Sequence, residues 1–146
     1  MTKSQRFKPV VKVAESRELA AAKVFGEAQR ILRERREKLQ ELFTYREEYA
    51  QKFLQTGAIG MSANEMQSFR NFLAKLDAAI AQQQQLVANA MKTLEEKKRL
   101  WLLQNSKKQT LEKVVDKYRE QENHANSKKE QREADERAQR RTKVKE

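Results

Sequence analysis

The sequence predicts an all-α fold: a long antiparallel two-helix coiled-coil hairpin with a protruding C-terminal helical tail. Ala, Glu, Lys, Leu and Arg make up 80 of the 146 residues, a bias that is typical of long helices and coiled coils. Only three Gly and one Pro are present, so the chain has few places to turn, which argues against sandwiches, barrels and doubly wound sheets. Apolar residues recur with heptad spacing in two long segments that a short Gly-containing segment separates.

The first helix is expected over residues ~9–55, where Pro9 suits the first helical turn because its missing N–H is no loss there. Steps of four and three residues from Phe7 to Phe53 give fourteen positions, of which eleven are apolar. The apolar ones are Phe7, Val11, Ala14, Ala21, Phe25, Ala28, Leu32, Leu39, Leu42, Tyr49 and Phe53. Such sustained spacing indicates the seam of a left-handed coiled coil.

A turn is expected over residues ~56–62. Gly57 fits a left-handed helix C-cap. Ser62 and Glu65 have the spacing of a capping box, and Met61 and Met66 that of a hydrophobic staple. These two signals predict that Ser62 is the N-cap of the second helix.

The second helix is expected over residues ~63–118, because a seam of sixteen positions from Met66 to Tyr118 contains twelve apolar residues. Trp101 occupies one of these positions and is interpreted as core filler. Beyond Tyr118 the pattern fades, so residues ~119–146 are expected to form a polar tail, a frayed or solvated helix that is ordered only against something else. We expect residues 1–146 to form a single elongated domain.

The two seams match when residues whose numbers add to about 118 or 119 are paired. This register places Phe53 opposite Met66 and Phe25 opposite Leu94, with a polar layer of Arg35 and Gln83. It also brings residues 1–38, of net charge +6, beside residues 92–118, of net charge +4, whereas residues 39–91 carry −1. The open end of the hairpin is therefore expected to be basic.

The composition excludes several classes of function. The chain has no Cys and one His, His124, so no disulfide and no Cys- or His-based metal site is expected. No phosphate-binding loop and no nucleophile motif is present. No apolar run is long enough to cross a bilayer, and the N-terminus lacks a signal-like apolar segment. We expect a cytoplasmic protein that is not an enzyme and uses no cofactor or metal.

A second apolar stripe flanks the seam. Leu42, Tyr45 and Tyr49 share one face of the first helix, and Phe72, Leu76 and Ala79 share one face of the second, with Gln83 one turn further on. Two helices cannot bury both a seam and a flank, so exposed aromatic surface is expected here, and such surface marks protein-binding sites. The alternative is that these rings fold over the seam and shield it.

Three segments resemble the FliJ family, a small component of the bacterial flagellar type III export apparatus. They are the run from Leu42 to Tyr49, the positions Phe69, Phe72, Leu73, Leu76, Ala79 and Ile80, and the tail block from Glu130 to Ala138. The tail motif is carried by Glu130, Arg132, Asp135 and Glu136. Arg132 stands where the family commonly shows Lys.

The resemblance implies a coiled coil similar to the central stalk of rotary ATPases, which would bind the flagellar export ATPase ring and promote its assembly. It implies ring contacts at Phe7, Val11, Arg33, Leu111, Val115 and Arg119. It also implies binding to the export gate protein FlhA and escort of export chaperones for minor filament-type substrates, with membrane association only through partners. The gate-binding residues implied are Leu42, Tyr45, Tyr49, Phe72, Leu76, Ala79 and Gln83.

Two other functions stay open. A basic coiled-coil arm could bind nucleic acid through Arg33, Arg35, Arg36 and Lys97, Lys98, Arg99. These clusters are interleaved with Glu34, Glu37, Glu95 and Glu96, which weakens the field, so nucleic acid is not the expected partner. The other alternative is a structural coiled-coil spacer.

Overall fold

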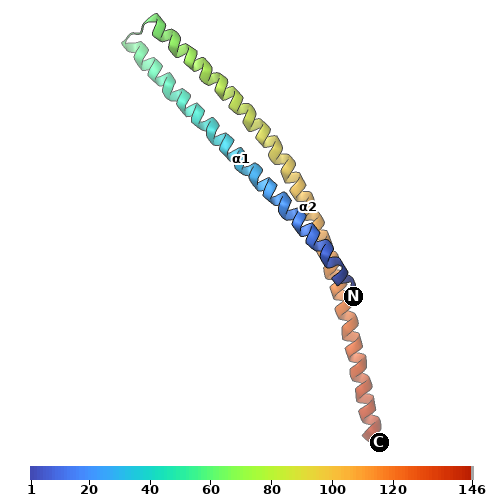
Figure 1. Cartoon of the computed structure of the whole chain (residues 1–146). Helices are drawn as coiled ribbons and strands as arrows, with labels where there is room; N and C mark the ends of the chain where they lie inside the picture. Colours follow the sequence, from blue (N-terminus) through green and yellow to red (C-terminus); the bar gives the residue numbers. More distant parts are fainter. Residues whose placement is uncertain (146) are drawn as a thin grey trace. The chain divides into compact units, whose positions relative to one another are not determined.

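The computed structural model describes residues 1–145, which form helix α1 (Lys3–Ile59) and helix α2 (Ala63–Lys145) and no strand (Figure 1). The two helices pack against each other as an antiparallel hairpin, so the predicted fold class is confirmed. The chain divides into two units. The turn unit is Ala21–Trp101, and the terminal unit combines Met1–Ala20 with the chain from Leu102 onward.

Helix α1 begins at Lys3 rather than near residue 9, because a capping box precedes it. The Thr2 backbone N–H donates to Gln5 Oε1 at 3.2 Å, and the Gln5 N–H donates to Thr2 Oγ1 at 3.3 Å. These reciprocal bonds satisfy N–H groups that the first helical turn leaves unpaired. Pro9 therefore lies inside the helix and not in its first turn. At this position the missing N–H of proline costs one helical hydrogen bond.

The connection between the helices is shorter than predicted and comprises residues 60–62. Gly57 is helical, and the glycine with positive φ is Gly60, at 112°. Its N–H donates to the Thr56 carbonyl at 3.2 Å, which closes the helix in the left-handed manner predicted for Gly57. The Ser62 cap is confirmed, because Ser62 Oγ accepts a hydrogen bond from the Glu65 N–H at 3.2 Å.

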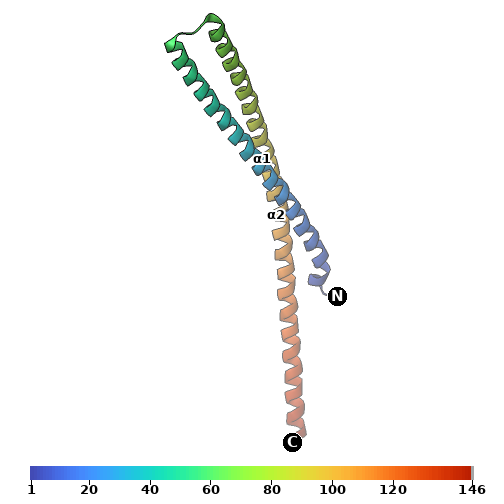
Figure 2. The same cartoon turned by 60° about the vertical axis from the view of Figure 1, so that its left-hand side comes forward.

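In the turn unit, α1 and α2 run alongside each other from this connection (Figure 2). The most deeply buried apolar side chains are predicted seam residues: Ala28, Leu32, Leu76, Ile80 and Ala90.

The detailed pairing differs from the predicted register. Phe53 contacts Phe69, with ring centroids 5.3 Å apart, while its predicted partner Met66 is 39% exposed. Phe25 stacks on Trp101 at 5.8 Å, two turns beyond the predicted Leu94. In a coiled coil a side chain enters a hole formed by four residues of the facing helix instead of meeting one residue. One-to-one pairing by number therefore places the partners of Phe25 and Phe53 too far towards the turn, whereas Tyr49 and Phe69, whose numbers add to 118, are in contact at 5.0 Å.

In the terminal unit, the interior is smaller. Ala14 and Val115 are buried, Phe7 and Tyr118 are in contact at 5.4 Å, and Lys108 pairs with Glu18 at 3.8 Å. Helix α2 does not end near residue 118 but continues to Lys145, past the start of α1 (Figure 1). Residues 123–144 are exposed throughout. Their Ala, Glu, Gln, Lys and Arg side chains favour helix even without burial.

Candidate functional site

Five rings form a continuous cluster between the helices of the turn unit. The ring cluster comprises Tyr45, Tyr49 and Phe53 on α1 with Phe69 and Phe72 on α2. Tyr49 lies at its centre, with ring centroids 5.0 Å from Phe69 and 4.4 Å from Phe72. Phe53 contacts Phe69 at 5.3 Å, and Tyr45 meets Phe72 edge-on at 6.1 Å. Tilted and edge-on contacts at such distances are favourable, so the flank residues Tyr45, Tyr49 and Phe72 join the seam residues Phe53 and Phe69 in one packed cluster.

The predicted flank stripe divides into a buried part and an accessible part. Leu76 is only 7% exposed and Gln83 only 8%, so both belong to the interior of the turn unit. Four members are half-buried: Leu42, Tyr49, Phe72 and Ala79. Tyr45 is 48% exposed and is the most accessible member. Thus some rings cover the seam, as the alternative interpretation expected, while Tyr45 presents aromatic surface to solvent.

Gln83 forms the polar layer that the predicted register placed opposite Arg35. Its Nε2 donates to the backbone carbonyl of Arg35 at 3.0 Å. The predicted polar layer of Arg35 and Gln83 is therefore present. It uses the backbone carbonyl of Arg35, and Arg35 as a residue is exposed. A buried amide with a partner of this kind fixes the register of two helices.

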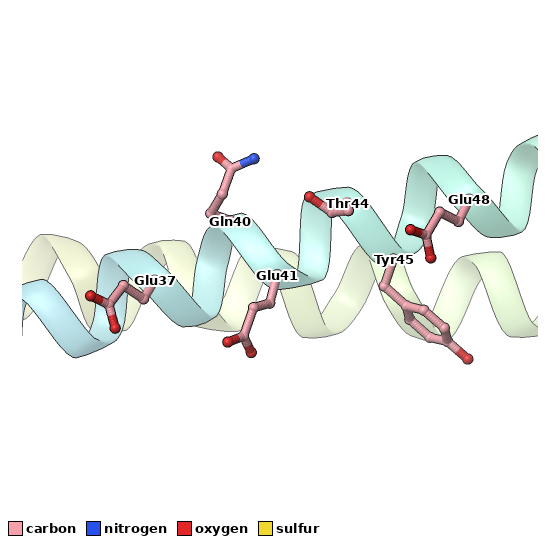
Figure 3. Close-up of a pocket in the computed structure, with 6 residues that line it drawn as sticks. All are labelled: Glu37, Gln40, Glu41, Thr44, Tyr45 and Glu48. Carbon is pink, nitrogen blue, oxygen red and sulfur yellow. The ribbon is translucent and has the colours of Figure 1, made fainter.

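Carboxylates surround the exposed Tyr45 ring. A shallow concavity on α1 is lined by Glu37, Gln40, Glu41, Thr44, Tyr45 and Glu48 (Figure 3). The three glutamates and the ring lie along one face of the helix (Figure 3). Glu41 lies 4.0 Å from Lys38, a loose exposed pair that leaves most of this negative charge available. The surface around Tyr45 is consequently apolar at its centre and acidic at its margin.

An ion pair lies across the helices beside the ring cluster. Arg46 Nε donates to Asp77 Oδ1 at 2.5 Å, and this hydrogen bond, with the charge of Asp77, raises the pKa of Arg46. Both side chains remain substantially exposed, so the pair fixes the local geometry more than it stabilises the fold.

The residues predicted to contact an ATPase ring are divided between the two units. Phe7, Val11, Leu111 and Val115 lie in the terminal unit, where Val115 is buried and the others are half-buried. Arg119 is exposed in the same unit. Arg33 belongs to the turn unit and is exposed there.

A polar contact that no sequence pattern indicated holds the N-terminus of α1. The Ser4 N–H and the Ser4 hydroxyl donate to the two carboxylate oxygens of Glu122, at 3.1 and 2.7 Å. These bonds lower the pKa of Glu122, with smaller contributions from Arg119 and the Lys3 backbone. Helix α1 has no acidic residue in its first turn, so Glu122 on α2 supplies the negative charge that a helix N-terminus favours.

The tail-motif residues Glu130, Arg132, Asp135 and Glu136 are helical and exposed. Among residues 1–145, no group of three or more His, Asp or Glu side chains is arranged to hold a metal ion, and no helix is long and apolar enough to cross a membrane.

Comparison with known proteins identifies the family. The family model described as flagellar FliJ protein matches residues 2–146. Searches of curated proteins and of solved structures found no match. Because the family model covers nearly the whole chain, the chain belongs to the FliJ family and has a role in flagellar protein export.

Proposed function

We propose that the chain is a non-enzymatic coupling component of the flagellar export apparatus, and hence of motility and chemotaxis. In this proposal it binds the export ATPase ring as a central stalk binds a rotary ATPase, and it promotes assembly of the ring. It also contacts the cytoplasmic domain of the export gate protein FlhA and escorts chaperones of minor filament-type substrates. It would act in the cytoplasm at the inner face of the membrane, held there by partners. Family membership over residues 2–146 is the observation that carries the proposal.

The surface around Tyr45 is the proposed gate-binding site. A half-exposed Tyr with packed rings behind it supplies rigid contact area at low entropic cost, a property that binding surfaces share. Leu42, Tyr49, Phe72 and Ala79 extend this surface. Leu76 and Gln83 act from the interior, where they hold the two helices in the register that presents Tyr45.

The terminal unit is the proposed ATPase-binding region. Four of its predicted contact residues are packed between its helices and so shape the unit: Phe7, Val11, Leu111 and Val115. Exposed groups such as Arg119 would contact the ATPase directly. Arg33, on the turn unit, would add a further contact. Exposed cations favour electrostatic steering towards an acidic partner surface.

ATP hydrolysis by the flagellar export ATPase tests the proposal, measured with and without the chain while light scattering follows ring assembly. We expect the chain to stimulate hydrolysis and assembly together. Arg119→Glu should reduce the stimulation. Lys52→Glu, an exposed change of the same charge in the turn unit, should retain it. Absence of stimulation by a chain that circular dichroism shows to be helical would overturn the stalk role.

A further inference from the structure

The turn unit contains an open apolar groove that the proposed function does not use. Helix α1 lines it with Val24, Ala28 and Ile31, and α2 lines it with Thr93 and Lys97. Val24 is 47% exposed and Ile31 36%, so β-branched aliphatic side chains face solvent on both sides of the buried Ala28. An adjoining hollow shares Ala28, Ile31 and Thr93 and extends the groove along α2 to Leu86 and Asn89.

The margins of this groove carry cations without intramolecular partners. Lys23 and Lys97 line it on opposite helices, and Arg35 lines its extension. None of these three forms an ion pair within residues 1–145. Glu27, the acidic residue in the lining, is already paired with Arg30, and the hydrogen bond from Arg30 lowers the pKa of Glu27. The groove therefore combines an apolar floor with a net positive rim.

We propose that this groove binds an acidic amphipathic helix of a partner protein. A groove between two antiparallel helices fits a third helix, whose apolar residues at i, i+3 or i+4 and i+7 would contact Val24 and Ile31. Asp and Glu side chains at the edges of that apolar face would pair with Lys23 and Lys97. The inference uses only the turn unit and does not depend on the stalk role.

Charge and shape disfavour two other occupants. A second copy of this groove would bring the same cations face to face, and such like-charge contacts are unfavourable. A flat anionic bilayer would have to reach Val24 and Ile31 in a concave surface that also contains the Glu27 carboxylate. A helix can enter the concavity and place its own carboxylates at Lys23 and Lys97, away from Glu27.

A displayed library of helical peptides tests the chemistry of the partner. Each peptide has about 18 residues, long enough for about five helical turns, with a fixed apolar face and randomised flanking positions. Selection uses the full chain and removes peptides that also bind Val24→Asp, a change at another exposed residue of the groove. We expect the flanks of the retained peptides to be enriched in Asp and Glu. Enrichment of Lys and Arg, or no peptide that prefers the unaltered chain, would overturn the proposal.

Variants with matched controls then locate the site. The dissociation constant of a selected peptide should rise about tenfold or more in Lys97→Glu, which places a negative charge against the bound carboxylates, and in Ile31→Asp, which places a charge against the apolar face of the peptide. The controls Lys52→Glu and Leu54→Asp introduce the same acidic residues at exposed positions outside the groove. Their dissociation constants for the peptide should stay within about twofold of that of the unaltered chain. Equal weakening by the controls would show that binding is not at the groove.

Two further measurements keep the test decisive. Melting curves check that each variant folds. If Ile31→Asp does not fold, Ile31→Ala replaces it, and we expect the affinity for the peptide to fall a few fold. Vesicles of phosphatidylglycerol and phosphatidylcholine are titrated in parallel. Vesicle binding that Lys97→Glu abolishes, with no peptide selected, would assign the groove to a membrane and contradict the proposal.

Discussion

The turn unit and the terminal unit are made from the same two helices, but different forces hold them together. In the turn unit, five rings and the buried Leu32, Leu76 and Ile80 join α1 to α2. In the terminal unit, a single ring pair is supplemented by the Ser4–Glu122 hydrogen bonds and the Glu18–Lys108 ion pair. Apolar contacts respond little to salt and pH, whereas charged contacts respond to both. The two units should therefore react differently to the same change in solution.

The largest effect is expected from a cavity in the turn unit. Leu76→Ala should lower the free energy of unfolding by about 2–4 kcal/mol, because Leu76 is only 7% exposed and its truncation leaves a void in the interior. Urea unfolding followed by circular dichroism measures the loss. Leu54→Ala, at a position 63% exposed, should cost less than about 0.5 kcal/mol. Equal losses in the two variants would contradict the assigned core.

Salt should separate the two proposed partner interactions. Affinity for the export ATPase should fall about tenfold between low and high salt, because the exposed cations of the terminal unit make the contact. Affinity for the gate domain should change much less, because an aromatic ring lies at the centre of that surface. Fluorescence anisotropy with both partners measures the two slopes. An ATPase affinity that does not depend on salt would mean that its contact is apolar.

A smaller loss of stability is expected from the buried amide of the turn unit. Gln83→Ala should lower the free energy of unfolding by about 1–2 kcal/mol, because it removes both buried volume and the hydrogen bond to the Arg35 carbonyl. Gln83→Met keeps the volume and should cost less. Urea unfolding of both variants provides the comparison. An unchanged midpoint in Gln83→Ala would show that this layer does not hold the helices together.

The smallest effect, and the one most dependent on pH, is expected from the Ser4–Glu122 contact. The native pKa of Glu122 is lowered, so its carboxylate stabilises the folded state above the ordinary value of 4.5 and this contribution is lost as the pH falls through the native pKa. Glu122→Gln should therefore speed hydrogen exchange in the first turn of α1 at neutral pH but not in acid. Glu120→Gln, an exposed neighbour, is the control. If Glu122→Gln exchanged faster than the unaltered chain by the same factor in acid as at neutral pH, the assigned role of the Glu122 carboxylate would be contradicted.

The heptad pattern predicted most of the fold because it is a local and repeated signal. Ala28, Leu32, Leu76 and Ile80, which it assigned to the seam, are buried in the interior, and the Ser62 signals identified the start of α2. Helix ends were predicted less well. Pro9 predicted a start near residue 9, whereas the Thr2–Gln5 capping box starts α1 at Lys3.

Contacts between distant residues could not be predicted in the same way. Ser4 and Glu122 are 118 positions apart, and no periodic pattern connects one serine to one glutamate among many. The flank stripe was predicted as a set, yet periodicity does not say which members are covered. Phe72 and Tyr49 cover each other, and that contact leaves Tyr45 as the accessible ring. Side-chain packing, rather than spacing, decides this distribution.

The most direct test of this account is the affinity of the export gate's cytoplasmic domain for Tyr45→Ala. Removal of a half-exposed ring should weaken binding about tenfold or more while the melting temperature stays nearly unchanged. Phe43→Ala, which removes a ring of similar exposure (42%) two positions away and outside the ring cluster, should bind as the unaltered chain does. Unchanged affinity in Tyr45→Ala, or an equal loss in Phe43→Ala, would contradict the proposed gate-binding surface.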